Sequence, residues 1–204
     1  MRRRSWRPSA RGGPDRAACG TAPPRPAAGG DNEAVSIHAS DPFATPDELK
    51  SPVRRLRGRL PAAVTLWTAA GERQGDKGLT VSSMLVVDGD PGRVLGLVDE
   101  ESDLWEAAES AGRFAVSLLE EEDRQLADKF GGLMPAPGGP FATGEWERTE
   151  WGPVPRGRSW AGCRLVGATE KGWSLLVEAV IERVELAADP AAPLIHERGR
   201  YRRS

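Results

Sequence analysis

The sequence predicts a mainly β domain, a barrel or a sandwich, with a few helices at its periphery. Beyond Leu60 the chain consists of short stretches rich in Val, Leu, Thr and Trp, separated by Gly, Asp and Pro, as all-β folds require. The chain has 204 residues. About forty of them, at the N-terminus, show no pattern of strands or helices, and the remaining length suits one domain. No period of 20–50 residues indicates a repeat protein.

Seven segments have the composition of strands. The second and third are joined by the sequence DGDPG, Asp88 to Gly92, which combines several turn formers. The segment 173–186 fits a helix as well as a strand by spacing, and its β-branched residues favour the strand. The expected strands are 63–69, 77–87, 93–98, 113–119, 162–169, 173–186 and 193–197.

Helix signals frame these strands. Thr45 begins a capping sequence, TPDE, and Ser51 with Pro52 restarts a short helix that runs to Arg59. Ser102 can cap a helix through Ala111, and a further helix is expected in 121–130. The segment from Gly131 to Pro140 is too rich in Pro and Gly to be regular.

The N-terminal segment has a different composition from the rest. Residues 1–34 hold seven Arg and three acidic residues, with almost no large aliphatic side chains, so folding could not offset their conformational entropy. We expect a disordered basic tail over residues 1–40 and one folded domain over 41–204. Two alternative interpretations of this segment remain. It could be a basic arm that binds nucleic acid or a membrane, or translation could begin downstream, for example at Val35.

Composition excludes several classes of function. The chain beyond residue 34 carries 21 basic and 27 acidic residues, which disfavours binding to a nucleic acid backbone. Its apolar runs are too short for a membrane span or a signal peptide. Cys19 and Cys163 imply no disulfide framework, and with His38 and His196 they have no metal-ligand spacing. We therefore expect a cytoplasmic protein without a metal site.

The inventory of catalytic motifs is sparse. The sequence contains no GxSxG elbow that would present a nucleophile to His196, no GxxxxGK[ST] loop and no GxGxxG that follows a strand. No catalytic residue is assigned, and any phosphate must be held in another way.

Two polar segments remain as candidates for binding. The stretch GLTVSSMLVV carries Thr80, Ser82 and Ser83 on an otherwise apolar strand, and the strand that ends at Asp99 leads through Ser102 into a helix. A helix N-terminus favours an anion, so a phosphate could lie between the two segments. Ordinary strand hydroxyls and ordinary capping by Ser102 are the commoner explanations.

The order of these motifs resembles the flavin reductase family. The matching runs are LPAAVTLWTA, then GLTVSSMLVVDGDPGRVLGLVDEESDLWEAAESAGRFAVSLL, RQLADKFGG and PLIHERGRYRR, and the resemblance covers roughly residues 55 to 203. The resemblance implies an FMN-binding split β-barrel. It also implies non-covalent FMN, with FAD or a deazaflavin as less common choices, reduction by NAD(P)H, and a homodimer with sites between protomers. It leaves room for a monooxygenase partner.

The resemblance also assigns site residues. Lys129 and Phe130, and Arg200 with Tyr201, would lie near the flavin, less firmly than the segments that line it. The lining residues implied by the family are Thr80, Ser82, Ser83, Val98, Asp99 and Ser102.

The chain departs from the family at two places. Asp99 stands where many members have Asn, and an acid is unfavourable beside a phosphate, so a backbone amide or a ribityl hydroxyl is its expected partner. Gly172 and Trp173 stand where many members carry a Gly-Asp-His run whose His lies beside the nicotinamide. Trp173 could stack on a ring, although core or interface packing is the commoner use. A non-catalytic flavin- or partner-binding module is the alternative function.

Overall fold

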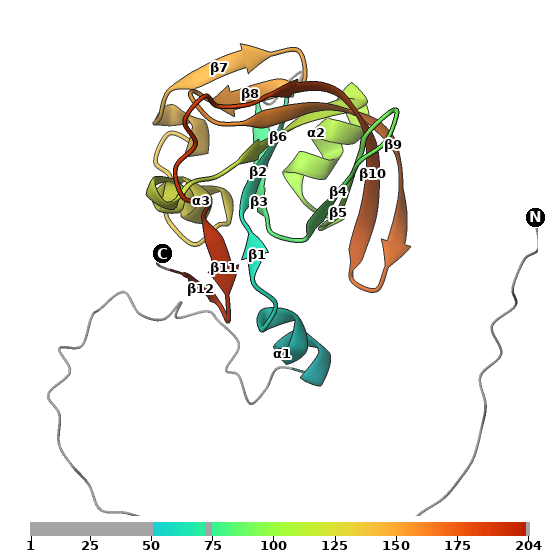
Figure 1. Cartoon of the computed structure of the whole chain (residues 1–204), viewed down its shortest axis with the longest axis vertical. Helices are drawn as coiled ribbons and strands as arrows, with labels where there is room; N and C mark the ends of the chain where they lie inside the picture. Colours follow the sequence, from blue (N-terminus) through green and yellow to red (C-terminus); the bar gives the residue numbers. More distant parts are fainter. Residues whose placement is uncertain (1–50, 72–74, 203–204) are drawn as a thin grey trace, which may run out of the picture. The chain divides into compact units, whose positions relative to one another are not determined.

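The structure, a computed structural model, describes residues 51–71 and 75–202 (Figure 1). Its centre is a curled antiparallel sheet of seven strands in the order β3-β2-β6-β9-β10-β5-β4. The strands are β2 (Thr65–Ala69), β3 (Lys77–Val81), β4 (Met84–Val87), β5 (Arg93–Val98), β6 (Arg113–Leu118), β9 (Trp160–Lys171) and β10 (Ser174–Glu185). This sheet is the half-barrel of a split barrel, so the mainly β fold class predicted from the sequence is confirmed.

Smaller elements surround this sheet. One small sheet contains β1 (Ala62–Ala63), β11 (Ile195–Glu197) and β12 (Arg200–Tyr201), and β7 (Trp146–Thr149) pairs with β8 (Gly152–Pro155). The helices are α1 (Pro52–Gly58), α2 (Asp103–Ala111) and α3 (Arg124–Phe130), with the 3-10 turns η2 (Glu121–Asp123) and η3 (Pro140–Ala142). The described helices include none long and apolar enough to cross a bilayer.

Local sequence explains where the helices begin and end. The Ser51 hydroxyl accepts from the Arg54 N–H at the start of α1, and Pro52 occupies the first turn, as predicted. The Ser102 hydroxyl caps α2 in the same way, and Gly112 ends it in the left-handed conformation, with a φ of 66°. The helix predicted from Thr45 and the expected tail lie outside the described residues, so both stay predictions.

Two predicted strands are interrupted. The stretch 77–87 was expected as one strand, but β3 pairs with β2 while β4 pairs with β5. The chain must therefore change partner, and it does so at Ser82 and Ser83. The stretch 63–69 is divided at Val64 in the same manner, between two different sheets. The ambiguous segment 173–186 is a strand, as its β-branched residues indicated.

Sequence analysis missed three short strands, β7, β8 and β12. The sequence of β8 is GPVP, in which two prolines argue against a strand. It is tolerated because β8 belongs to a separate two-stranded ribbon, where few ladder hydrogen bonds are needed. In β7 and β12 the segments are four and two residues long, which is too short for a periodicity to be visible.

The main core lies between the curled sheet and α2, which Figure 1 shows within the curve. Leu104, Ala107 and Ala108 of α2 are buried there. The ring of Trp67 stacks on Phe114, with centroids 4.8 Å apart. A second core cluster packs α3 against the start of β2 through Phe130, Leu66 and neighbours. The sheet is thus covered on both sides near β2.

A glycine on β5 makes room for Trp67. A Cβ built on Gly96 would lie 2.6 Å from Cη2 of Trp67, closer than carbon atoms approach. Trp67 is also fixed on its other face by Phe114 and by the hydrogen bond from its Nε1 to Thr65 Oγ1, at 3.1 Å. The indole therefore has little freedom to move away.

We expect Gly96→Ala to lower the free energy of unfolding by roughly 1–3 kcal/mol, because one methyl group overpacks the core at Trp67. Urea denaturation followed by tryptophan fluorescence measures this. Gly167→Ala is the matched control, since a Cβ at Gly167 of β9 meets nothing within 4 Å. Equal stability of the two variants would contradict the packing described.

Candidate functional site

Two predicted segments meet at one end of the half-barrel. The backbone N–H of Leu97 donates to the Ser83 carbonyl at 2.9 Å, and the Ser83 hydroxyl donates to the Leu97 carbonyl at 3.2 Å. The junction between β3 and β4 therefore lies against the last residues of β5, as the sequence predicted. We call this place the junction site and define it as Ser82, Ser83, Val98, Asp99 and Ser102.

The hydroxyl groups of the TVSS segment differ in what they contact. Thr80 Oγ1 donates to the Ala127 carbonyl at 2.8 Å and so attaches β3 to α3. Ser83 is bonded to β5. Within the described ranges, Ser82 is half-buried and its hydroxyl makes no hydrogen bond. Ser82 therefore keeps both its donor and its acceptor for a ligand, whereas Thr80 can only accept.

The start of α2 is organised by Asp99 and Ser102. The Ser102 hydroxyl donates to the Asp99 carbonyl at 2.7 Å and accepts from the Trp105 N–H at 3.3 Å. Asp99 is exposed, and its Oδ1 accepts from the Glu101 N–H at 3.0 Å. The capping role considered for Ser102 is thus present, and Asp99 does address a backbone amide.

The charge around the start of α2 is mostly negative. Asp99, Glu100, Glu101 and Asp103 are all exposed there. Lys77 of β3 brings the compensating charge, with its Nζ 2.9 Å from Asp103 Oδ2. A phosphate at this helix end would meet carboxylates as well as the helix dipole, which opposes the electrostatic argument made from the sequence.

Lys129 and Phe130 do not extend into the junction site. Phe130 is 4% exposed and packs edge-on against Phe141 and Trp146. A Cβ on Gly78 would lie 2.7 Å from its ring, which explains the glycine two residues before Thr80. Lys129 Nζ donates to Thr143 Oγ1 at 2.7 Å, beside a hollow of about 460 Å³ between α3 and the loop before β7.

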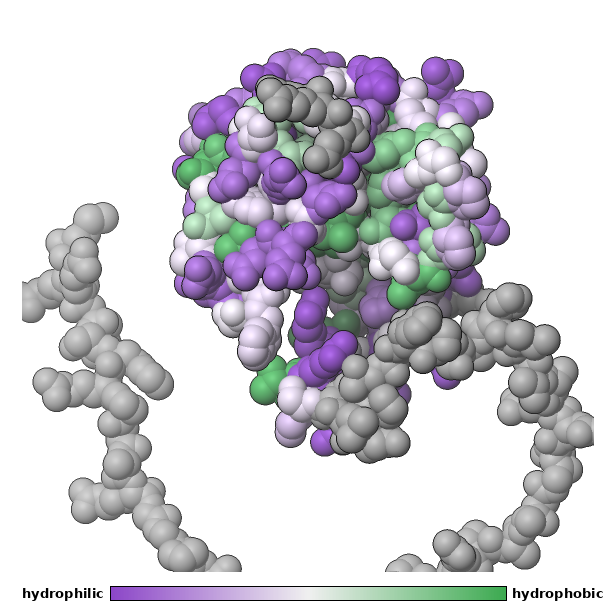
Figure 2. All heavy atoms as spheres, turned by 180° about the vertical axis from the view of Figure 1, so that it is seen from behind, coloured by the Kyte–Doolittle hydropathy of each residue, from purple (hydrophilic) through white to green (hydrophobic). Residues whose placement is uncertain are grey.

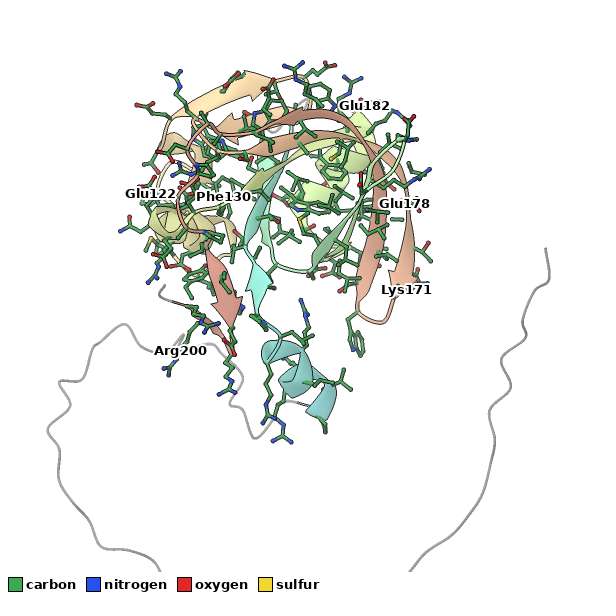
Figure 3. All side chains as sticks on the ribbon, viewed as in Figure 1. Glu122, Phe130, Lys171, Glu178, Glu182 and Arg200 are labelled. Atoms are coloured by element: carbon green, nitrogen blue, oxygen red, sulfur yellow. The ribbon has the colours of Figure 1, made fainter. Side chains whose placement is uncertain are left out.

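Arg200 and Tyr201 lie on β12, on the α3 side of the domain. The Tyr201 hydroxyl donates to Asp128 Oδ1 at 2.8 Å, and burial, with this hydrogen bond second, raises the pKa of the phenol. Arg200 is exposed, and Figure 3 shows it at the edge of the domain, away from α2. Among the described residues, neither Arg200 nor Tyr201 forms a hydrogen bond or an ion pair with the junction site.

Trp173 is 99% exposed at the tip of the β9–β10 hairpin. Of the commoner uses considered above, core or interface packing, core packing is therefore wrong for this residue, and interface packing stays a prediction. Gly172 beside it has a φ of 64°, which forms the tight turn. Leu175 pairs with Val98, so the hairpin tip lies next to the end of β5 and the junction site.

Other titratable groups have structural roles. Arg158 contacts Glu120 at 3.1 Å and Asp123 at 2.6 Å, and its hydrogen bond to Asp123 raises its pKa. It fixes η2 beside the end of β8.

Burial raises the pKa of Cys163 to about 12, which makes the thiol unreactive. Burial, followed by Arg57, lowers the pKa of His196. No metal-binding group of His, Cys, Asp or Glu occurs in the described residues.

A groove that sequence reasoning missed adjoins the junction site. It lies between α2 and the β9–β10 hairpin and has a volume of about 840 Å³. The periodicity of a single strand or helix gave no signal for it, because the groove exists only where the two elements diverge. Its lining residues are Glu100, Glu101, Trp105, Glu109, Leu165, Gly167, Ala168, Thr169, Glu170 and Leu175.

Comparison with known proteins identifies the family. The flavin reductase like domain family matches residues 57–204, and the chain belongs to this family. It is 28% identical over 159 residues to the reductase component of the FADH(2)-dependent resorcinol hydroxylase of Rhizobium sp., covering 76% of this chain and 88% of that protein. It is 28% identical over 155 residues to the reductase component of 4-hydroxyphenylacetate 3-monooxygenase of Thermus thermophilus, covering 76% and 97%.

Solved structures agree on the fold. The nitrilotriacetate monooxygenase component B homolog of Mycobacterium thermoresistibile is similar with a TM-score of 0.67 and 25% identity, covering 74% of this chain and 83% of that chain. The NADH:FAD oxidoreductase SgcE6 of Streptomyces globisporus gives a TM-score of 0.68 at 24% identity, covering 78% and 99%. The family, the split barrel and the oxidoreductase class predicted from the sequence are confirmed, and the comparisons do not favour the non-catalytic module.

Proposed function

We propose that this protein is an NAD(P)H-dependent flavin reductase that binds FMN non-covalently at the junction site. The observation that carries the proposal is the half-buried Ser82 hydroxyl, without a partner in the described part of the chain, beside Ser83 and the end of β5. Membership of the flavin reductase family supports it.

The residues of the junction site fit the uncharged parts of a flavin. Ser82 can donate and accept and Ser83 can still accept, while the side chain of Val98, 2% exposed, packs in the core beneath them. These groups suit the ribityl hydroxyls and the edge of the ring. Lys77 would supply positive charge toward a phosphate, in competition with its partner Asp103.

The bound flavin would supply the chemistry, which is hydride transfer from NAD(P)H to the flavin. The protein's task is then to bind, orient and exclude water. This agrees with the lack of an acid–base residue at the junction site: Asp99 and Ser102 are engaged in the turn before α2, and the Cys163 thiol is buried elsewhere.

A monooxygenase partner follows from the same relatives. Those from Rhizobium sp. and Thermus thermophilus are named as reductase components of a hydroxylase and of a monooxygenase. We extend this arrangement to the present chain, which would pass reduced flavin to a separate oxygenase. FAD in place of FMN stays open, because one relative is named an NADH:FAD oxidoreductase. The cytoplasmic location expected from the sequence stays a prediction.

The exposed edge of the sheet supports a homodimer. On β4, Leu85 and Val86 are 66% and 64% exposed, and among the described strands only β5 pairs with β4, which leaves its other edge open. Val86, Leu118, Val184 and other apolar residues line an adjacent hollow of about 140 Å³. Figure 2 shows that apolar side chains reach the surface at several places on the face behind Figure 1. An apolar, unpaired edge favours a partner surface of the same kind.

We expect Ser82→Ala combined with Ser83→Ala to weaken FMN binding about tenfold, because two hydrogen bonds of about 0.5–1.5 kcal/mol each are lost. Quenching of flavin fluorescence measures the affinity. Ser110→Ala, at an exposed position of α2, is the control and should bind as the parent does. Unchanged affinity in the double variant would show that the flavin lies elsewhere.

Anaerobic addition of NADH or NADPH separates the reductase from a binding module. If the flavin absorbance is lost at least as fast as the protein turns over, the protein is a reductase. Stable binding without bleaching by either nucleotide would contradict the proposed activity.

For the dimer, we expect Val86→Glu to yield monomers, because a charge would be buried at the β4 edge without a partner. Size-exclusion chromatography with light scattering gives the mass. Leu133→Glu serves as the control, since Leu133 is exposed in the loop after α3. A parent protein that is already monomeric, or a Val86→Glu dimer, would refute this interface.

A further inference from the structure

Helix α1 carries an apolar stripe that nothing in the described chain covers. Val53, Leu56 and Leu60 are 76%, 64% and 63% exposed, and no residue of α1 is buried. Their positions follow the i, i+3, i+7 spacing of a helix that lays one face into a groove of another molecule. Figure 1 shows α1 outside the curled sheet, joined to it through β1. An exposed apolar stripe of this kind indicates an interaction surface.

The same segment carries positive charge without a counter-ion. Within residues 51–71 and 75–202, none of its arginines forms a salt bridge. At 3.6 residues per turn, Arg57 and Arg59 lie on either side of the apolar stripe, and Arg54 and Arg55 lie farther round the helix. A partner of this surface therefore needs an apolar floor and acidic walls.

The groove between α2 and the β9–β10 hairpin has both properties. Trp105, Leu165 and Leu175 give it an apolar lining. Among the described residues, none of its carboxylates forms a salt bridge, and no Lys or Arg lines it. The charges of the helix and of the groove are thus complementary. The lining carboxylates are those of Glu100, Glu101, Glu109 and Glu170.

The attachment of α1 favours a second copy of the chain as the owner of the groove. The Arg198 N–H donates to the Gly58 carbonyl at 2.6 Å, and β1, which follows α1, pairs with β11. These contacts fix the end of α1 to the small sheet, and α1 lines no part of the groove of its own protomer. In a symmetric dimer each protomer offers one helix and one groove, so the contact forms twice.

The occupant of the groove also affects the charge at the junction site. Glu100 and Glu101 line the groove, and they lie between Asp99 and Ser102 in the chain. Carboxylates at this place oppose the phosphate of a flavin. Arginines brought by a partner's helix would neutralise them, so the junction site would be electrostatically complete only in the dimer.

We propose that α1 of each protomer docks into the acidic groove of a second copy of this chain, with its apolar stripe on the floor and its arginines beside the glutamates. The proposal rests on the proposed function, because it assumes the homodimer. It adds a second contact to the one at the β4 edge, and it connects dimer formation to flavin binding.

The direct test reverses the charge on each side of this contact in the full-length chain. The helix variant carries Arg57→Glu and Arg59→Glu, and the groove variant carries Glu109→Lys and Glu170→Lys. Each should weaken the dimer at least about tenfold, because like charges would face each other. Sedimentation equilibrium over a series of protein concentrations measures the dissociation constant, and circular dichroism checks that each variant is folded.

A mixture of the two variants in equal amounts should regain the affinity of the parent dimer. In the mixed dimer, the reversed helix meets the reversed groove, and the unchanged helix meets the unchanged groove. Only a contact between two chains can recover in this way, because docking within one chain would stay repulsive in both variants.

Two double reversals away from the contact are the matched controls. Arg54→Glu with Arg55→Glu changes the side of α1 away from the stripe. Glu147→Lys with Asp189→Lys changes two exposed acidic residues that do not line the groove. Both controls alter the net charge as much as the test variants do, and both should dimerise as the parent does.

Weaker dimers in both test variants, with recovery in the mixture, support the proposal. An unchanged dimer in either variant, which is the result expected if α1 binds an oxygenase instead, would overturn it. So would a mixture that does not recover, or equal weakening in the controls.

Flavin fluorescence gives a second readout. FMN should bind more weakly to each test variant alone than to their mixture, and equal affinity in all three would contradict the connection to flavin binding. A parent protein that is monomeric, or that does not bind FMN, would instead refute the proposed function itself.

Discussion

The structure depends on a change of pairing partner within one continuous hydrophobic stretch. β3 and β4 follow each other in the chain, yet they form opposite edges of the seven-stranded sheet. Ser82 and Ser83 lie between them, where the chain stops pairing with β2 and starts to pair with β5. Their side chains are therefore outside the regular packing of a strand. The mutual hydrogen bonds of Ser83 and Leu97 fix this crossing against β5. The Ser82 hydroxyl is left without a partner in the described chain.

The surroundings of this crossing divide its chemistry into two parts. On one side, the hydroxyl groups of Ser82 and Ser83 offer a neutral polar surface, with the buried Val98 beneath it. On the other, the start of α2 and the hairpin tip expose carboxylates, with Lys77 paired to Asp103. A ligand with an uncharged ring system meets the first part favourably, whereas the carboxylates of the second part oppose a phosphate group.

Much of the fold follows from local sequence signals. The caps at Ser51 and Ser102 and the β-branched stretch of β10 are local features, and they predicted their elements correctly. The break at Ser82 was not predictable, because Gly78 to Val87 is uniformly suited to a strand and only the closure of the sheet interrupts it. The strands β7 and β8 were missed because their stability comes from mutual pairing and not from residue pattern.

The candidate site was predictable only in part. The hydroxyls and the end of β5 meet as the resemblance implied, but Phe130 is core, and Lys129 faces a different hollow. Motif similarity preserves the order of residues and says nothing about the direction of each side chain. The acidic groove depends on the distance between α2 and a hairpin more than fifty residues away in sequence, which no local pattern contains.

Hydrogen–deuterium exchange with and without FMN tests the location of the flavin most directly. The account predicts slower amide exchange in residues 80–85 and 97–104 when FMN is bound, with α3 and the segment 140–149 unchanged. Protection confined to the hollow beside Lys129, or the absence of any protected segment at saturating FMN, would contradict it.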